Sequence, residues 1–180
     1  MQNNAGVETM DATDIKRVNS LWKKVYPYLA AQIMETYRRD TGVVLELGPF
    51  SGGISRELGR LYPRLDITVR DWGIGTEESE KFDLIIFRGA FFSIFKKKYL
   101  LRGIFEALKD KGMAFVGGGY GKGIPQELID EIAGESRVLN DRLGRRRVSI
   151  EELKGLIKES GLVANCRIVE EGGVWLVIRK

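Results

Sequence analysis

Apolar and polar residues form two patterns along the chain, one with helical spacing and one of short apolar runs that is typical of buried strands. Apolar residues three or four positions apart, among them Ile15, Val18 and Trp22, predict a helix over 14–39, which Pro27 should kink or break. Short apolar runs predict four strands, at 43–48, 65–69, 82–87 and 113–116. The first and third runs lack a polar alternation, which suits strands buried on both faces of a parallel sheet.

Helical spacing returns between these strands and after them. It predicts helices over 54–62, 99–111, 125–133 and 150–160. Ser149, with an acid three residues on, should open the last of these helices, and Gly161 should end it. The stretch 134–147 is polar and gives no clear pattern.

The chain closes with a predicted antiparallel hairpin, in which strands at 163–169 and 174–178 are joined by residues 170–173. Strands that alternate with helices imply a parallel sheet with right-handed crossovers. We therefore expect one α/β domain over 1–180, with a mostly parallel sheet, helices on both faces and the hairpin at its end. Ligands of such sheets bind beyond the carboxyl ends of the strands.

The amino-acid composition excludes several classes of protein and of catalytic or metal site. The 180 residues are 43% hydrophobic and 30% charged, which excludes a disordered or fibrous chain. The absence of His removes His-ligated metals and His-dependent triads, and a lone Cys166 excludes a disulfide framework or a cysteine zinc cluster. We expect no metal site and a core position for Cys166. No apolar run is long enough for a transmembrane segment and residues 1–14 lack an apolar signal core, so we expect a cytoplasmic protein.

The clearest local signal is a glycine-rich turn, Glu46 to Gly53, between a buried strand and a helix. Glycines let the backbone approach a ligand closely, and the following helix offers unpaired N–H groups. Asp71 ends the second strand, where a carboxylate can hold both hydroxyls of a ribose. The dinucleotide fingerprint fails because Phe50 stands at its second glycine, and a Walker-type loop before Lys122 also fails.

Four segments in order resemble class I S-adenosylmethionine-dependent methyltransferases. Glu46, Gly48 and Gly52 match the acid-x-Gly-x-Gly-x-Gly motif of that family, with Phe50 in place of the middle glycine. The other three segments resemble the Phe-Asp strand of the family, its Leu-Lys-Pro-Gly-Gly turn, and its late helix before the closing hairpin; they are 82–87, 108–113 and 148–162. The resemblance covers residues 40–180 and implies a Rossmann-like methyltransferase fold.

The resemblance also implies a cofactor, S-adenosyl-L-methionine, and the residues that bind it. These residues are Glu46, Gly48, Pro49, Phe50, Ser51, Gly52, Gly53, Asp71, Trp72, Arg88 and Gly89. Residues 1–40 would form a helical lid over a core of residues 41–180, with Trp22, Tyr26 and Tyr28 in the lid or in the core.

One departure from the family concerns the segment after Asp71. Only residues 72–81 separate it from the next strand, which is too short for the usual helix and third strand. We therefore expect the third strand to be missing. The loop itself would then contact the adenine, through Trp72 or Ile74 for packing and Glu77 or Glu78 for its amino group.

Methyl transfer from a sulfonium mainly needs alignment and exclusion of water, so the absence of His is no objection. Tyr120 and Arg88 are the candidate catalytic residues, with Asp71 and Glu46 as further candidate bases. Arg88 is either an ion-pair partner at a strand end or a contact for an anion. The segment 88–92 lacks the signature of enzymes that methylate amino groups of adenine or glutamine, and Cys166 is too far along the sheet for pyrimidine methylation.

The expected function is methyl transfer to a small-molecule acceptor. The alternatives are a non-catalytic module that binds the cofactor or a partner, and an RNA methyltransferase. The 29 Lys and Arg residues against 25 Asp and Glu permit nucleic acid without requiring it. The acceptor and the oligomeric state stay open at this point.

Several segments allow two interpretations. The Lys96–Lys98 and Arg145–Arg147 clusters are solvated or contact phosphate, and Gly117–Gly123 is a flexible gate or a solvent loop. An apolar cluster would pack under the N-terminal helix or line an acceptor pocket or a membrane contact; it consists of Phe91, Phe92, Ile94 and Phe95.

Overall fold

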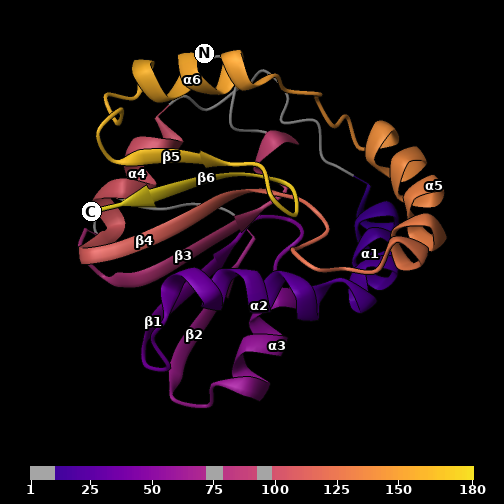
Figure 1. The fold of residues 1–180 in the computed structure, drawn as a ribbon, viewed down its shortest axis with the longest axis horizontal. Helices are drawn as coiled ribbons and strands as arrows, with labels where there is room; N and C mark the ends of the chain where they lie inside the picture. Colours follow the sequence, from indigo (N-terminus) through magenta and orange to yellow (C-terminus); the bar gives the residue numbers. More distant parts are fainter. Residues whose placement is uncertain (1–10, 72–78, 93–98) are drawn as a thin grey trace, which may run out of the picture.

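Six strands form one sheet in the computed structural model, which describes residues 11–71, 79–92 and 99–180 (Figure 1). The strands are β1 (Gly42–Leu47), β2 (Leu65–Arg70), β3 (Phe82–Arg88), β4 (Leu108–Gly118), β5 (Cys166–Val169) and β6 (Val174–Arg179). Their order across the sheet is β2-β1-β3-β4-β6-β5. The first four strands run parallel, and β6 lies antiparallel to both β4 and β5, which confirms the expected parallel sheet with a closing hairpin.

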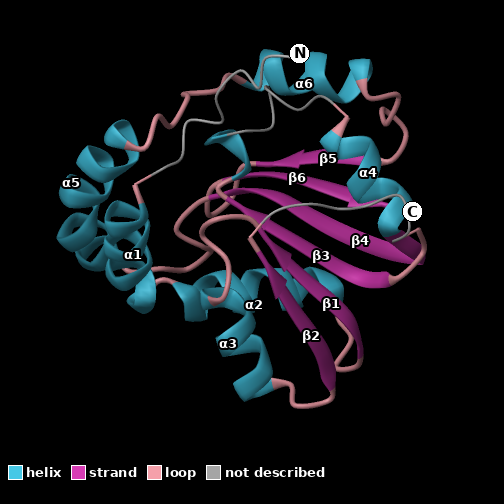
Figure 2. Cartoon of the chain, turned by 180° about the vertical axis from the view of Figure 1, so that it is seen from behind, coloured by secondary structure: helices cyan, strands magenta, loops and turns pink. Residues whose placement is uncertain are grey.

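Helices cover both faces of this sheet (Figure 2). They are α1 (Ala12–Leu21), α2 (Tyr26–Tyr37), α3 (Gly53–Leu61), α4 (Leu100–Ala107), α5 (Gln126–Arg142) and α6 (Ile150–Glu159), with short 3-10 turns at Trp22–Lys24 and Ala90–Phe92. Successive residues of β3 alternate between two apolar cores: Leu84 packs with α2 and α3, and Ile85 packs with α4 and α6. The alternation explains why this strand is apolar without interruption from Leu84 to Phe87.

The sheet ends at β2 within the described residues, where the family would add its third strand. This agrees with the short segment between β2 and β3. Residues 72–78 of that segment lie outside the described part of the chain, and with them the expected adenine contacts of Trp72, Ile74, Glu77 and Glu78.

Helix boundaries follow local signals where these are strong. Pro27 stands in the first turn of α2, so the predicted helix breaks into α1, a 3-10 turn and α2. The capping box of α6 is complete, because Ser149 and Glu152 each bond the other's backbone N–H. Asp11 caps α1 by accepting from the backbone of Thr13 and Asp14, so the helix begins before the predicted residue.

Three boundaries differ from the prediction. The helix expected to reach 111 ends at Ala107, because Leu108 is extended and pairs with Phe82 in the sheet. The polar stretch after 133 continues α5 to Arg142, with Leu139 buried on its inner side. The first hairpin strand begins at Cys166 rather than at 163.

The N-terminal segment divides between two places. Helix α2 packs on the sheet, with Leu29 and Ile33 in the core against β1 and β3. Helix α1 lies beside α5, beyond the carboxyl ends of the parallel strands (Figures 1 and 2). Ion pairs join the two helices, from Arg17 to Glu135 and from Arg142 to Asp14.

Candidate active site

The turn after β1 is shaped by two glycines with left-handed backbones, Gly48 at φ +103° and Gly52 at φ +97°. At Gly48 a Cβ would come within 2.6 Å of the Phe87 ring, so a side chain there has no room. At Gly53 a Cβ would come within 2.2 Å of the Tyr26 ring. The turn is therefore held tightly between β3 and α2, and α3 starts directly after it.

Glu46 ties this turn to β1. Its side chain is fully buried, and Oε2 accepts hydrogen bonds from the backbone N–H of Gly52 at 2.9 Å and of Ser55 at 2.8 Å. The other oxygen, Oε1, is buried and has no hydrogen-bond partner among residues 11–71, 79–92 and 99–180, and the same is true of Ser55 Oγ. A buried, unpaired carboxylate oxygen is costly, so Glu46 has capacity left for a donor that the protein does not supply.

Arg88, the last residue of β3, is also buried, with 5% of its surface exposed. Its guanidinium lies 4.3 Å from the centre of the Trp22 ring, and Nη1 donates to the carbonyl oxygen of Phe50 at 3.2 Å. Burial lowers the pKa of Arg88, and the nearby Tyr26 and Glu46 offset this only partly. No ion pair found among the described residues includes Arg88. The structure gives it aromatic and carbonyl contacts, so the first of the two interpretations of Arg88, an ion pair at a strand end, is not observed there.

Phe50 stands where the family motif has its middle glycine. Its side chain is 1% exposed and belongs to the apolar core. The ring packs against Gly89, where a Cβ would come within 2.4 Å of it and where φ is +74°. Phe50 thus points into the core, while its neighbours Pro49, Ser51 and Gly52 are half-buried at the carboxyl edge.

Asp71 lies next to the turn. Leu47 pairs with Arg70, and the N–H of Gly48 donates to the carbonyl oxygen of Arg70 at 2.9 Å. The residue that follows Arg70, Asp71, is therefore adjacent to Gly48 at the carboxyl edge, and it is exposed. The backbone of the glycine-rich turn and the end of β2 therefore lie side by side at this edge.

Tyr120 follows β4 and reaches the same edge. Its ring stacks on Trp22, with centres 5.1 Å apart and planes 8° apart. A cavity of about 70 Å³ lies here; its walls include Trp22, Phe50, Arg88, Gly89, Phe91, Gly117 to Tyr120, Asn140 and Arg145. The structure brings Tyr120 and Arg88, both candidate catalytic residues, to one cavity.

The loop 117–123 is packed from Gly117 to Gly121, while Lys122 and Gly123 are exposed. A Cβ on Gly119 would come within 2.2 Å of the carbonyl oxygen of Gly172, and the N–H of Gly121 donates to that oxygen at 2.8 Å. Phe91 is buried with the α4 and α6 core rather than under the N-terminal helix. The Phe92 side chain, Ile94, Phe95 and Lys96–Lys98 lie outside the described residues.

The sequence pattern did not identify two residues near the carboxyl edge of the sheet. Ser136 and Asn140 of α5 are buried, and Ser136 Oγ accepts from Trp22 Nε1 at 3.1 Å and from Asn140 Nδ2 at 3.3 Å. They lie in the stretch that showed no clear pattern. Only their spacing of four residues on a helix that continues past 133 would have placed them on one face.

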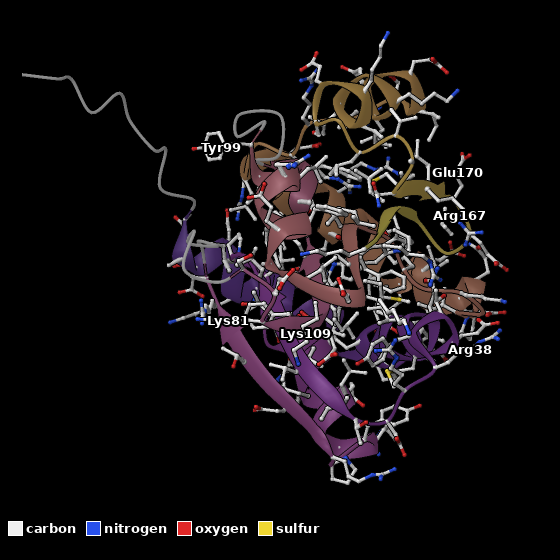
Figure 3. The ribbon with its side chains drawn as sticks, turned by 90° about the vertical axis from the view of Figure 1, so that its left-hand side faces the viewer. Arg38, Lys81, Tyr99, Lys109, Arg167 and Glu170 are labelled. Atoms are coloured by element: carbon white, nitrogen blue, oxygen red, sulfur yellow. The ribbon has the colours of Figure 1, made fainter. Side chains whose placement is uncertain are left out.

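A larger groove of about 500 Å³ lies elsewhere, between α2 and the hairpin. Arg38 and Arg167 line it from opposite sides (Figure 3). Lys122 in this groove is paired with Glu35 and Glu171. None of the residues predicted to bind the cofactor lines this groove.

Other features bear less on the site. Cys166 is half-buried in β5, and burial raises the pKa of its thiol to about 11. The described residues include no cluster of acids and cysteine arranged to hold a metal ion. None of the helices in the described ranges is both long enough and apolar enough to cross a membrane.

Comparison with known proteins rests on structure alone. No family model matches the sequence, and no curated protein matches it. A candidate S-adenosyl-L-methionine-dependent methyltransferase from Methanococcus maripaludis is 23% identical, with a TM-score of 0.74 over 100% of this chain and 97% of that chain. PigF with SAH is 17% identical, with a TM-score of 0.57 over 93% of this chain. An O-methyltransferase family 2 protein from Planctomyces limnophilus in complex with apigenin is 14% identical, with a TM-score of 0.57 over 97% of this chain.

This chain covers only 59% of PigF and 63% of the Planctomyces protein, so both contain much that is absent here. The match to the Methanococcus protein extends over nearly the whole of both chains. The chain has the class I S-adenosylmethionine-dependent methyltransferase fold.

Proposed function

We propose that this protein binds S-adenosyl-L-methionine at the carboxyl ends of β1, β2 and β3 and transfers its methyl group to a small-molecule acceptor. The observation that carries the proposal is the pair of incomplete buried charges. Glu46 keeps one oxygen without a partner, and Arg88 has no carboxylate partner among the described residues. The amino-acid end of the cofactor carries an ammonium and a carboxylate, which are the two groups that this pair lacks.

The remaining contacts follow from position. The backbone of Gly48 to Gly53 would line the amino-acid end, and Asp71 beside it would accept from the two ribose hydroxyls. PigF was determined with SAH, and the Planctomyces protein with apigenin, which supports a cofactor and a small acceptor of this kind. Both similarities are distant, so the residues of this chain carry the argument.

The bound cofactor would supply an electrophilic methyl group on a sulfonium. The protein's part is to align the acceptor and to exclude water. Helices α1 and α5 lie beyond the strand ends, where the Trp22 ring stacks on Tyr120, a residue that follows β4. The hydroxyl of Tyr120 would orient the acceptor or take its proton, and Arg88 would hold the cofactor in place.

Asp71→Ala tests the cofactor site. We expect calorimetric affinity for S-adenosylmethionine and for its demethylated product to fall at least tenfold, because carboxylate hydrogen bonds contribute about 1.5–3 kcal/mol. The fold should stay intact, since Asp71 is exposed. Asp66→Ala is the matched control, an exposed acid at the other end of the same strand.

Unchanged affinity in Asp71→Ala would count heavily against the proposal. Cofactor binding without turnover over a panel of small acceptors would instead favour a non-catalytic module. Binding of RNA that weakens steeply with added salt would favour an RNA methyltransferase.

A further inference from the structure

Five arginines lie between 137 and 147, and the structure separates them into two sets. Arg142 is paired with Asp14, and Arg146 is paired with Glu152. Arg137, Arg145 and Arg147 take part in none of the ion pairs found in the described ranges, and all three line a single cavity of about 250 Å³. The basic run is therefore not uniformly a solvated loop, because part of it converges on one space.

The charge of this cavity is unbalanced. Its other lining residues are Tyr120, Ala133, Ser136, Asn140 and Asp141. Asp141 is the single acid among them, against three guanidinium groups. Cations gathered without enough anions repel one another, and a guanidinium matches the two oxygens of a carboxylate or phosphate group.

This cavity adjoins the candidate active site. Tyr120, Asn140 and Arg145 line both it and the smaller cavity that contains Arg88 and Gly89. Asn140 is 7% exposed and is held by its bond to Ser136, so this part of the shared wall is fixed by α5. A molecule in the larger cavity would have its other end at the carboxyl edge of β3, where the methyl group would be presented.

We propose that the methyl acceptor is a small organic acid whose carboxylate or phosphate group binds Arg137, Arg145 and Arg147. The proposal rests on the proposed function, because it names the substrate class of that site. A small acid fits better than RNA, since three arginines that form no ion pair within the described part of the chain line one cavity of limited volume, while Arg142 and Arg146 are used within the protein.

The test measures binding of four matched probes by calorimetry at low salt, in the presence of the demethylated cofactor. The probes are benzoate, phenyl phosphate, benzamide and phenol. We expect at least one of the two anions to bind tenfold or more tightly than its neutral counterpart. The stronger anion distinguishes a carboxylate from a phosphate acceptor.

Variants then locate the binding. Arg145→Gln and Arg137→Gln should each weaken the anion at least fivefold and leave the neutral probes unchanged. Arg146→Gln is the matched control from the same run, because its side chain does not line the cavity. Arg137→Gln and Arg146→Gln should keep cofactor affinity, because neither residue lines the cavity that contains Arg88 and Gly89.

Several results would overturn the proposal. These are equal affinity for anions and neutral probes, no anion binding, anion binding that survives both cavity variants, or an RNA oligonucleotide that binds at the arginines while the small acids do not compete. Loss of the proposed function would show separately, as failure of the wild-type protein to bind the cofactor in the same titrations.

Discussion

The two ends of the central strands each hold an acid, and the protein satisfies the two acids very differently. Asp83, near the start of β3, accepts from the backbone N–H of Val43 at 2.8 Å and from Lys109 Nζ at 2.8 Å. Arg39 approaches its other oxygen to 3.9 Å. Glu46, near the end of β1, uses one oxygen for two backbone N–H groups and leaves the other without a partner.

The cations near the two acids differ in the same way. Lys109 is half-exposed and bonds Asp83 directly. Arg88 is buried near Glu46 but contacts the Trp22 ring and the Phe50 carbonyl instead. Both acids help to join neighbouring segments, so fold stability explains Asp83 completely and explains only half of Glu46.

The difference between Asp83 and Glu46 indicates which end of the strands is built to bind a ligand. Buried polar groups in folded proteins nearly always have partners, and an exception calls for a cause. At the amino end the Asp83 carboxylate is paired with Val43 and Lys109, which is what a structural contact requires. At the carboxyl end, one Glu46 oxygen has no partner among the described residues and the Arg88 guanidinium contacts no carboxylate there; both lie at the edge where ligands of such sheets bind.

Glu46→Gln should give the largest effect. The amide keeps the shape and one acceptor oxygen for the turn, but it removes the charge that would hold the ammonium of the cofactor. We expect calorimetric affinity for S-adenosylmethionine to fall by about 10- to 100-fold, which corresponds to about 1.5–3 kcal/mol for a charged hydrogen bond. The free energy of unfolding without ligand should change by less than about 1 kcal/mol.

The opposite pattern would contradict the comparison. If Glu46→Gln kept its cofactor affinity and lost several kcal/mol of stability in a urea titration, Glu46 would be a structural acid of the same kind as Asp83. The matched control is Asp83→Asn, which makes the same chemical change at the other end of the strands.

Asp83→Asn should have the second largest effect, on stability alone. The variant keeps the bond from Val43 but weakens the interaction with Lys109, which is partly exposed and can return to water. We expect a loss of about 1–2 kcal/mol in the free energy of unfolding, below the value for a fully buried charge. Cofactor affinity in the folded protein should stay within twofold of wild type, and a larger change would couple the two ends.

The sequence predicts the start of β3 and the glycine-rich turn after β1 well, because the signals for both are local. Three features determine the structure only of residues close to them in the chain. They are the Phe82-Asp83 pair at the start of β3, the glycines after β1 and Pro27 at the start of α2. The missing third strand follows from chain length alone. These features need no knowledge of distant segments.

The sequence predicts the surroundings of Arg88 and Phe50 poorly, because these depend on distant contacts. Trp22 reaches Arg88 from 66 positions away in the chain, and the Phe50 ring packs against Gly89, which follows β3. Leu108 continues a helical pattern but joins the sheet through Phe82, so tertiary pairing outweighs local preference. The Asp83–Lys109 pair likewise required the β3–β4 register.

The smallest expected effect of Asp83→Asn is a change in how the free energy of unfolding depends on pH. Burial alone would raise the pKa of Asp83, but the bonds from Lys109 and Val43 and the charge of Arg39 outweigh it and lower the pKa. A carboxyl whose pKa is lower in the folded state stabilises the protein above the unfolded pKa of about 3.9, and this stability is lost as pH falls through the folded value. Urea titrations from pH 6 to pH 3 should therefore show wild type losing more stability than Asp83→Asn, by less than about 1 kcal/mol. Parallel curves of unfolding free energy against pH for the two proteins would mean that the partners of Asp83 do not stabilise its charged form. Asp83 could then not serve as the structural acid with which Glu46 is compared.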